Sequence, residues 1–289
     1  LADLLLLGMF GGFFIVPLYA LVQLRSTADK RARIIAANNI INAFFMVLGA
    51  LAAAAMFAGG LSIPMLFAVA AICNAAVAVF IYGLVPEFLL RFIAWVLIHL
   101  FYRLQARGVE HIPHEGAALV VCNHVSFVDP VILMAVSPRP IRFVMDHRIF
   151  RTPIISFIFR HSRAIPIAPA KEDAAMMERA FDEVSAALRE GELVGIFPEG
   201  QITDNGEICP FRPGVTRILE RDPVPVIPLA LRGLWGSFYS RKGGPAMSKP
   251  FRRPLFSKIA VVGAPPVAPA EATPENLQQI VEHLRGDWK

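Results

Sequence analysis

The chain contains, at residues 117–129, the stretch Ala-Ala-Leu-Val-Val-Cys-Asn-His-Val-Ser-Phe-Val-Asp. Its apolar half, Ala117–Cys122, follows a glycine and has the composition of a short buried strand. Polar residues directly after such a strand lie at its carboxyl end, where open α/β sheets bind their ligands. If the chain turns tightly there, the Asp129 carboxylate reaches one ring nitrogen of His124 and leaves the other nitrogen as a base. We predict that this pair is catalytic; the alternative is a capping aspartate and an incidental loop histidine.

The composition indicates a chain that is part membrane and part globular. The 289 residues allow one large domain or two ordinary ones, and 55% are hydrophobic against 18% charged. That balance, with a mean hydropathy of +0.54, is too apolar for a chain that is soluble throughout. The net charge of +5 suits a protein beside an anionic membrane surface. Nucleic acid is not expected as a partner, because no basic block with interleaved aromatic residues is present.

Three apolar segments near the start of the chain are long enough to cross a bilayer. Residues 4–24 carry no charge, and neither do residues 34–86, which a Gly-Gly pair and a proline interrupt at residues 59–64. Residues 1–84 are therefore predicted to form three transmembrane helices. Four asparagines in these spans should face neighbouring helices or a cavity rather than lipid: Asn38, Asn39, Asn42 and Asn74.

The charges in the connecting segments predict the orientation of the spans. The link at residues 25–33 is basic, the turn at residues 59–64 carries no charge, and three arginines follow the third span. By the positive-inside rule, the first link and everything after residue 87 lie in the cytoplasm. Residues 92–102 are apolar but too few to cross, so residues 85–107 are predicted to be an interfacial linker helix.

The sequence from Gly108 onward has the pattern of an α/β domain, which we assign to residues 108–289. Residues 172–189 have helical periodicity, and Thr273-Pro274-Glu275 begins a terminal helix that reaches about Leu284. Six apolar runs predict strands: Ala117–Cys122, Ile141–Met145, Ala164–Ile167, Leu193–Phe197, Val224–Leu231 and Ile259–Val262.

A second predicted strand is also followed closely by a polar residue, and we call such a position a strand exit. The run Leu193–Phe197 ends in the block Phe197-Pro198-Glu199-Gly200. Two such exits would bring Glu199 and His124 to one end of the sheet, which is how a site is assembled from distant segments.

Two arginines near these blocks are candidates for binding a phosphate. Arg163 precedes a third predicted strand, and Arg212 follows the second block after a short loop. A guanidinium group binds phosphate through paired, charge-assisted hydrogen bonds. Taken singly, each arginine fits a solvated surface position as well.

Four blocks, in order along the chain, resemble the glycerolipid acyltransferases, the family of 1-acylglycerol-3-phosphate acyltransferase. They are residues 123–129, Arg163 with the Ala-Ile-Pro-Ile after it, residues 197–200 and residues 224–228. The resemblance covers about residues 85–289. Residues 1–84 resemble the last three helices of a major facilitator superfamily transporter. Together the halves resemble bacterial fusions of a lysophospholipid transporter with a 2-acylglycerophosphoethanolamine acyltransferase.

The resemblance implies a fold and a reaction. The fold is an α-helical transmembrane segment of three spans followed by an α/β glycerolipid-acyltransferase domain. The reaction moves a fatty acyl group from acyl-CoA or acyl carrier protein to a lysophospholipid hydroxyl and needs no cofactor. With the orientation predicted above, the protein is expected in the plasma (bacterial inner) membrane, with its acyltransferase domain on the cytoplasmic face.

The resemblance also implies roles for individual residues. His124 is the general base, and Asp129 orients it. Within the substrate-binding set, Glu199 and Gly200 help to form the acceptor pocket, and Arg163 binds the phosphate. The full substrate-binding set is Asn123, Arg163, Phe197, Pro198, Glu199, Gly200 and Arg212.

One departure from the family pattern concerns the acceptor. The family often continues the Phe-Pro-Glu-Gly block with a small residue, Arg and Ser, whereas Gln201-Ile202-Thr203 follows here. The missing arginine argues against an acceptor with a bare phosphomonoester. A phosphodiester head group then fits better, with Arg212 as the substitute.

Two other functional classes fit parts of the sequence. A lysophospholipid transporter fragment with a non-catalytic lipid-binding domain is the alternative, but a binding domain has no use for a base. Three spans are also too few for a transport path. A serine hydrolase is disfavoured because the chain lacks the G-x-S-x-G nucleophile elbow.

Neither a metal site nor a disulfide framework is predicted. His111 and His114 are separated by a proline and lack an evident third ligand. The cysteines are odd in number and widely spaced, which fits a reducing cytosolic location: Cys73, Cys122 and Cys209. The chain begins in an apolar stretch with no basic segment before it, so we expect the tail of a longer protein rather than a signal peptide.

Overall fold

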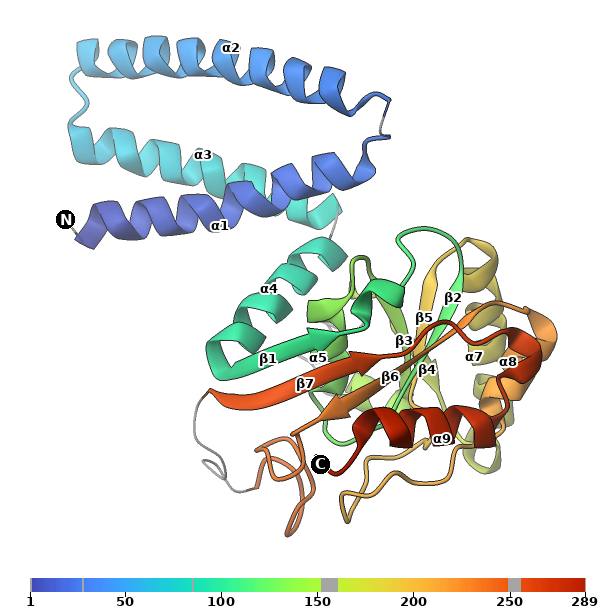
Figure 1. The fold of residues 1–289 in the computed structure, drawn as a ribbon. Helices are drawn as coiled ribbons and strands as arrows, with labels where there is room; N and C mark the ends of the chain where they lie inside the picture. The colour runs from blue at the N-terminus through green and yellow to red at the C-terminus, as the bar shows by residue number, and fades with distance from the viewer. Residues whose placement is uncertain (1, 28, 85, 152–160, 249–255, 289) are drawn as a thin grey trace. The chain divides into compact units, whose positions relative to one another are not determined.

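The computed structural model describes residues 2–27, 29–84, 86–151, 161–248 and 256–288. The chain divides into two compact units, Leu1–Leu89 and Leu90–Lys289. The first unit is helical, and the second combines helices with a β-sheet (Figure 1).

The helical unit contains α1 (Ala2–Arg25), α2 (Arg31–Ala58) and α3 (Ile63–Leu84). All three helices are long and apolar enough to cross a membrane, as the sequence predicts. Among their described residues, α2 and α3 contain none that is buried. Apolar helices with exposed side chains are suited to lipid rather than water.

Two of the four asparagines make contacts between helices. Asn38 and Asn42 of α2 both donate to the hydroxyl of Tyr19 in α1, at 3.1 and 2.7 Å. Residues four apart lie on one face of a helix, so this face of α2 is turned toward α1. The prediction is confirmed for these two residues and stays a prediction for Asn39 and Asn74.

The second unit is built on a seven-stranded mixed sheet with the order β1-β7-β6-β2-β5-β3-β4. Its strands are β1 (Tyr102–Arg107), β2 (Ala118–Cys122), β3 (Ile141–Asp146), β4 (Ile165–Ile167), β5 (Leu193–Ile196), β6 (Val226–Arg232) and β7 (Ser257–Gly263). The five strands from β6 to β4 are parallel, while β7 is antiparallel to β6 and parallel to β1. The six predicted strands are confirmed, with ends that differ by at most two residues.

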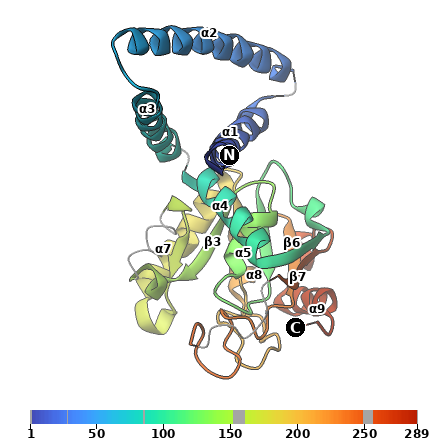
Figure 2. The same ribbon diagram turned by 90° about the vertical axis from the view of Figure 1, so that its left-hand side faces the viewer.

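Helices cover both faces of the sheet (Figure 2). The helices and short 3-10 segments are α4 (Pro86–Phe101), η1 (Val109–His111), α5 (Asp129–Val136), η2 (His147–Arg151), α7 (Ala170–Arg189), α8 (Gly214–Arg221), η3 (Pro269–Glu271) and α9 (Pro274–Arg285). Side chains of α4 and α5 share one core with Val120 of β2, and those of α7, α8 and α9 share the other with Leu119 and Val121. Alternate residues of β2 therefore enter opposite cores, as in a strand buried on both faces.

Both predicted helices of this unit are present. α7 begins at Ala170, and its helical geometry is broken at Asp173, where φ is −152° and ψ is 94°. α9 begins after Thr273, whose hydroxyl accepts a hydrogen bond from the Asn276 N–H at 3.2 Å and so caps the helix.

The structure corrects the predicted linker helix at residues 85–107, whose first residue lies outside the described residues. α4 ends at Phe101, and residues 102–107 form β1, with Leu104 paired to Ile259 of β7. Tyr102 and Leu104 pack on the core while Arg103 between them is exposed. This alternation is the pattern of a strand with one buried face, and pairing with β7 satisfies its backbone groups.

The order of the strands places the topological switch point of the sheet beside β2. From β2 the chain continues to β3, β4 and β5 on one side of it and then to β6 on the other. In open α/β sheets, ligands bind outside the carboxyl ends of the strands where the connections diverge in this way. The residues after β2 and β5 are therefore those expected to meet a substrate.

We predict that Gly108→Ala destabilises the α/β unit. Gly108 has a φ of 69°, and a Cβ there would collide with the carbonyl of Gly263 at the end of β7. A left-handed alanine and an overpacked contact together lower the free energy of unfolding by about 2–4 kcal/mol. Denaturant unfolding of the detergent-solubilised protein measures the change.

The matched control is Gly214→Ala. A Cβ at Gly214, the first residue of α8, has nothing within 4 Å. Alanine also favours a helix over glycine by up to about 1 kcal/mol. Unfolding midpoints that fall equally for both variants would contradict the role assigned to the contact between Gly108 and Gly263.

Candidate active site

The parallel pairing of β2 with β5 brings two predicted site residues together. Val121 lies opposite Ile196, so His124 and Glu199, three residues beyond each, are level at the carboxyl edge. The backbone N–H of His124 donates to Glu199 Oε1 at 2.6 Å. The prediction that the two strand exits meet at one end of the sheet is confirmed.

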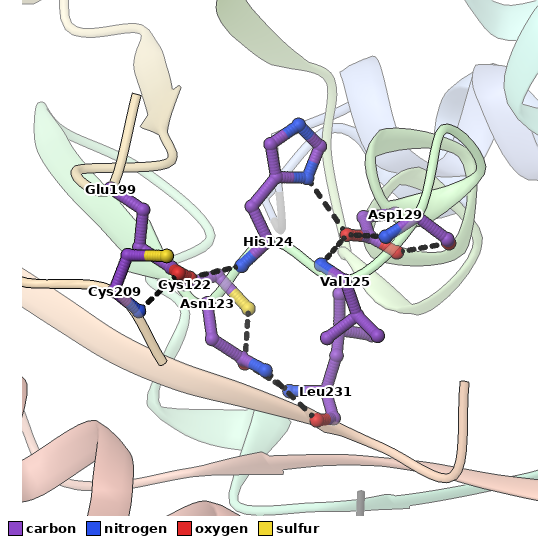
Figure 3. A network of polar contacts seen from close by, with 9 residues as sticks. Cys122, Asn123, His124, Val125, Asp129, Glu199, Cys209 and Leu231 are labelled. Carbon is purple, nitrogen blue, oxygen red and sulfur yellow. Dashed lines mark hydrogen bonds and ion pairs between the residues drawn. The ribbon is translucent and has the colours of Figure 1, made fainter. Parts of the chain in front are cut away.

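The Asp129 carboxylate is the centre of the turn that follows β2 (Figure 3). It is fully buried, and its Oδ2 lies 2.8 Å from His124 Nδ1. The same oxygen accepts from the backbone N–H groups of Val125 and Ser126 at 2.6 and 2.8 Å, and Oδ1 accepts from the Ser126 hydroxyl at 2.5 Å. These donors hold the carboxylate in place, so the tight turn predicted for residues 124–129 is present.

The contact with Asp129 defines which nitrogen of His124 can act as a base. A carboxylate accepts hydrogen bonds, so the proton of a neutral ring belongs on Nδ1 and Nε2 is left with its lone pair. Figure 3 shows Nε2 pointing away from Asp129. The side chain is 18% exposed, and its ring stacks on Phe197 with centroids 4.2 Å apart and planes at 17°. A substrate hydroxyl can therefore approach one nitrogen of a ring whose orientation is fixed.

Glu199 is held by two backbone groups rather than facing solvent. It is 2% exposed, Oε1 accepts from the His124 N–H, and Oε2 accepts from the Cys209 N–H at 2.6 Å. Burial raises the pKa of this carboxyl, an effect that the two backbone donors oppose. The carboxylate thus ties the exit of β2 to the loop that ends in Cys209.

Asn123 lies in the sheet rather than in a substrate pocket. Its side chain is 1% exposed, Oδ1 accepts from the Leu231 N–H at 2.7 Å, and Nδ2 donates to the Leu231 carbonyl at 3.2 Å. The amide thereby continues the pairing of β2 with β6 one step past Cys122. Its predicted contact with substrate has no support in this geometry.

Arg163 lies away from the dyad, contrary to the prediction. Its guanidinium pairs with Glu192 and, at 3.7 Å, with Glu190, and both acids precede the amino end of β5. Glu199 follows the carboxyl end of the same strand, so the Arg163 ion pairs and the dyad lie at opposite ends of β5. The order of blocks along a sequence does not show which end of the sheet a residue reaches, and the predicted role of Arg163 in binding phosphate has no support in this geometry.

Arg212 is the arginine that the fold brings to the site. Its backbone N–H donates to the Pro198 carbonyl at 2.9 Å. Its guanidinium lies over Gly200, where a Cβ would be 2.9 Å from the arginine Cζ. Gly200 has a φ of 65°, so both its conformation and this close approach favour glycine. Arg212 is exposed, and within the described chain its side chain has no hydrogen bond or ion pair, which leaves it available for an anion.

Three residues of the site are absent from the predicted set. Ser126 donates to Asp129, Thr203 donates its N–H to the His124 carbonyl at 3.0 Å, and Cys209 donates to Glu199. The Ser-x-x-Asp spacing of Ser126 and Asp129 is a known local hydrogen-bonding signature and could have identified the first. The other two act through backbone groups, for which a sequence carries no signal.

The site has the groups that proton transfer requires. A buried carboxylate, an oriented imidazole and a nearby guanidinium suit removal of a proton from a hydroxyl on an anionic substrate. The described residues contain no group of three or more His, Cys, Asp or Glu side chains that could hold a metal ion.

The comparisons with known proteins agree with this chemistry. Residues 103–232 match the sequence profile of a protein family described as Acyltransferase. They include nearly all of β1, both strand exits and β6, so the match falls on the part of the sheet that carries the candidate site.

The relatives are acyltransferases of one kind. The chain is 27% identical over 148 residues to "1-acyl-sn-glycerol-3-phosphate acyltransferase BAT2, chloroplastic" of Brassica napus, covering 51% of this chain and 42% of that protein. It is 26% identical over 195 residues to 1-acyl-sn-glycerol-3-phosphate acyltransferase alpha of Mus musculus, covering 66% and 65%. The chain thus spans less than two thirds of the length of these relatives.

A solved structure shares the fold. The 1-acyl-sn-glycerophosphate acyltransferase PlsC of Thermotoga maritima superposes with a TM-score of 0.53 at 21% identity, over 85% of this chain and 93% of that chain. Neither the family match nor these relatives support the transporter resemblance of residues 1–84, which stays a prediction.

We predict a pH-dependent contribution of Glu199 to stability. Because its pKa is raised on folding, the folded protein binds this proton more tightly than the unfolded chain does. The contribution of Glu199 to stability is therefore greatest at low pH and falls as the pH rises from the ordinary glutamate value through the raised one. Unfolding midpoints of the wild type and Glu199→Gln, compared over that range, measure it; a difference that is independent of pH would contradict the prediction.

Proposed function

We propose that this protein is a membrane-bound O-acyltransferase that moves a fatty acyl group from acyl-CoA or acyl carrier protein to a lysophospholipid hydroxyl. The observation that carries the proposal is the dyad of His124 and Asp129, with Nε2 exposed at the carboxyl edge of an acyltransferase-family domain. The names of the relatives support an acylglycerol phosphate or similar lysophospholipid as the acceptor.

In the proposed reaction, His124 Nε2 takes the proton of the acceptor hydroxyl while the hydroxyl oxygen attacks the thioester carbonyl. The carbon–sulfur bond breaks, an ester forms, and the imidazolium returns its proton to the departing thiolate. Asp129 stabilises the transient positive charge and keeps Nδ1 protonated. A thioester is already activated, so the scheme requires no nucleophile from the protein. General-base catalysis by His124 accounts for a factor of about 10² to 10⁴ in the rate. Positioning of the two substrates accounts for the remainder of the rate enhancement.

Arg212 is proposed to bind the phosphate of the acceptor. It lies over Gly200 beside the dyad, and a guanidinium matches the geometry of a phosphate. The relatives' names specify a phosphomonoester, whereas the absence of an arginine two residues after Gly200, where Ile202 stands, favours a diester head group. Parallel assays with 1-acylglycerol 3-phosphate and lysophosphatidylethanolamine distinguish the two.

The proposed location is the plasma (bacterial inner) membrane, with the catalytic unit on the cytoplasmic face. The basic link between the first two apolar helices and the uncharged turn between the next two support this orientation. Within the globular unit, α4 exposes an apolar face suited to a bilayer surface, made of Ile93, Trp95, Leu97, Leu100 and Phe101. A site next to the bilayer meets its lipid substrate without extracting it into water.

We predict that His124→Ala lowers kcat by at least about 10²-fold with little change in stability, because only one hydrogen bond of a partly exposed side chain is lost. Asp129→Asn should lower both rate and stability, because an uncharged amide oxygen is a weaker acceptor for the Val125 and Ser126 N–H groups and no longer stabilises a positive charge on His124. Acyl transfer by purified full-length protein to a panel of lysophospholipids measures the rate. A folded His124→Ala protein with near wild-type turnover would show that the proposed base is wrong.

A pair of arginine variants tests the phosphate site. Arg212→Ala should raise the acceptor KM about tenfold or more, because a charge-assisted contact to the phosphate is lost. Arg163→Ala should leave the acceptor KM unchanged, because Arg163 is paired with Glu190 and Glu192 at the other end of β5. The opposite pattern would restore Arg163 as the phosphate ligand and remove Arg212.

A further inference from the structure

His124 is contacted three times by the segment that follows β5, residues 197–203. The Phe197 ring stacks on the imidazole at 4.2 Å. Glu199 Oε1 accepts the His124 N–H at 2.6 Å, and the Thr203 N–H donates to the His124 carbonyl at 3.0 Å. One segment thus holds the ring, the backbone donor and the backbone acceptor of a single residue.

We propose that residues 197–203 form a clamp that positions His124, and that Glu199 is a positioning residue of this clamp rather than a ligand of the acceptor. The inference rests on the proposed function, in which His124 is the base. It replaces the acceptor-pocket role that the family resemblance implies for Glu199.

Burial, together with two backbone contacts, separates Glu199 from a substrate in this structure. Both carboxylate oxygens accept backbone N–H groups, from His124 and Cys209, at 2.6 Å. The residue is 2% exposed, whereas the neighbouring Arg212 is exposed. An acceptor that bound Glu199 directly would first have to displace the groups that enclose this carboxylate.

The clamp supplies a constraint that Asp129 does not. The bond from Asp129 to Nδ1 holds one edge of the imidazole, but a single hydrogen bond tolerates small changes in the side-chain torsions of His124. Phe197 limits these changes from one face of the ring, and Phe143 supports Phe197 with its ring centroid 5.8 Å away and the two ring planes at 11°. Gly195 makes room for Phe143, because a Cβ there would lie 2.6 Å from its ring. A displacement of about 1 Å at a reacting group can reduce the rate about 10²-fold.

The kinetic test uses Glu199→Gln and Phe197→Leu. Glutamine keeps the shape of Glu199 but presents a donor to one of the two N–H groups, and leucine removes the stacking surface while keeping the site apolar. The clamp predicts a fall in kcat of about 10- to 100-fold, with the acceptor KM within about twofold of wild type. It also predicts that the double variant loses much less than the product of the two single losses, because both act through His124.

The matched control is Asp222→Asn. Asp222 is also a buried acid with a charge-assisted bond, from Arg189 Nε at 2.8 Å, but it lies at the end of α8. The kcat and the acceptor KM of the Asp222→Asn enzyme should match those of the wild type. A Glu199→Gln enzyme with a raised acceptor KM and unchanged kcat would overturn the clamp and restore the acceptor-pocket role. If Glu199→Gln failed to fold, Phe197→Leu would decide by the same criteria.

A second measurement does not depend on activity. Diethyl pyrocarbonate modifies neutral histidine, and peptide mass spectrometry reads each site separately. Loosening the clamp should increase the modification rate of His124 severalfold in Glu199→Gln and Phe197→Leu. The rate of His147, whose side chain is 12% exposed, should not change and serves as the internal reference. Unchanged rates at His124 in both variants would overturn the clamp.

These measurements separate the clamp from the proposed function. A wild-type protein that acylated no lysophospholipid from either donor would disprove the function. The modification rates would then still show whether residues 197–203 fix the His124 ring.

Discussion

The parallel pairing of β2 with β5 is the constraint on which the site depends. With Val121 opposite Ile196, the next residues of both strands leave the sheet side by side, about 4.8 Å apart. At that spacing the Glu199 side chain reaches the His124 backbone, and the ring of Phe197 reaches the imidazole. A shift of one residue in the register of either strand would turn the side chains of that strand to the opposite face of the sheet and remove the arrangement.

The site contains two buried carboxyl groups, Asp129 of the dyad and Glu199 next to it, and backbone N–H groups donate hydrogen bonds to both. This affects Cys122, which is fully buried next to them. Burial, and then the charges of Asp129 and Glu199, raise the pKa of its thiol well above the usual value. A protonated thiol is a poor nucleophile. Cys122 therefore does not compete with the acceptor hydroxyl for the thioester that the proposed reaction uses.

Much of this architecture could be predicted because the strands buried on both faces are continuous apolar runs, such as Ala118–Cys122. The pair of His124 and Asp129 could be predicted because it is local, five residues apart in one turn. β1 was missed because its polar and apolar residues alternate at a sheet edge directly after an apolar helix. At residues 102–107, the sequence is as consistent with a continuation of the preceding helix as with a separate strand.

The two predicted roles that this geometry does not support, those of Glu199 and Arg163, share one property: the contacts of both residues depend on the tertiary fold. A glutamate after a strand has the chemistry of a ligand, and only the approach of the Cys209 loop shows that Glu199 is enclosed. An arginine before a strand has the chemistry of a phosphate anchor, and only the sheet order shows that Arg163 faces Glu190 and Glu192. Residue type indicated the chemistry available in each case, and strand pairing decided where that chemistry was placed.

The side-chain amide of Asn123 imitates a peptide group, and this limits which residue can stand at the end of β2. Because its Oδ1 accepts the Leu231 N–H and its Nδ2 donates to the Leu231 carbonyl, Asn123 extends the β2–β6 ladder by one step. An aspartate of the same shape would present only acceptors and would leave the Leu231 carbonyl without this donor. Since both contacts are to the backbone of β6, they do not depend on which side chain stands at position 231.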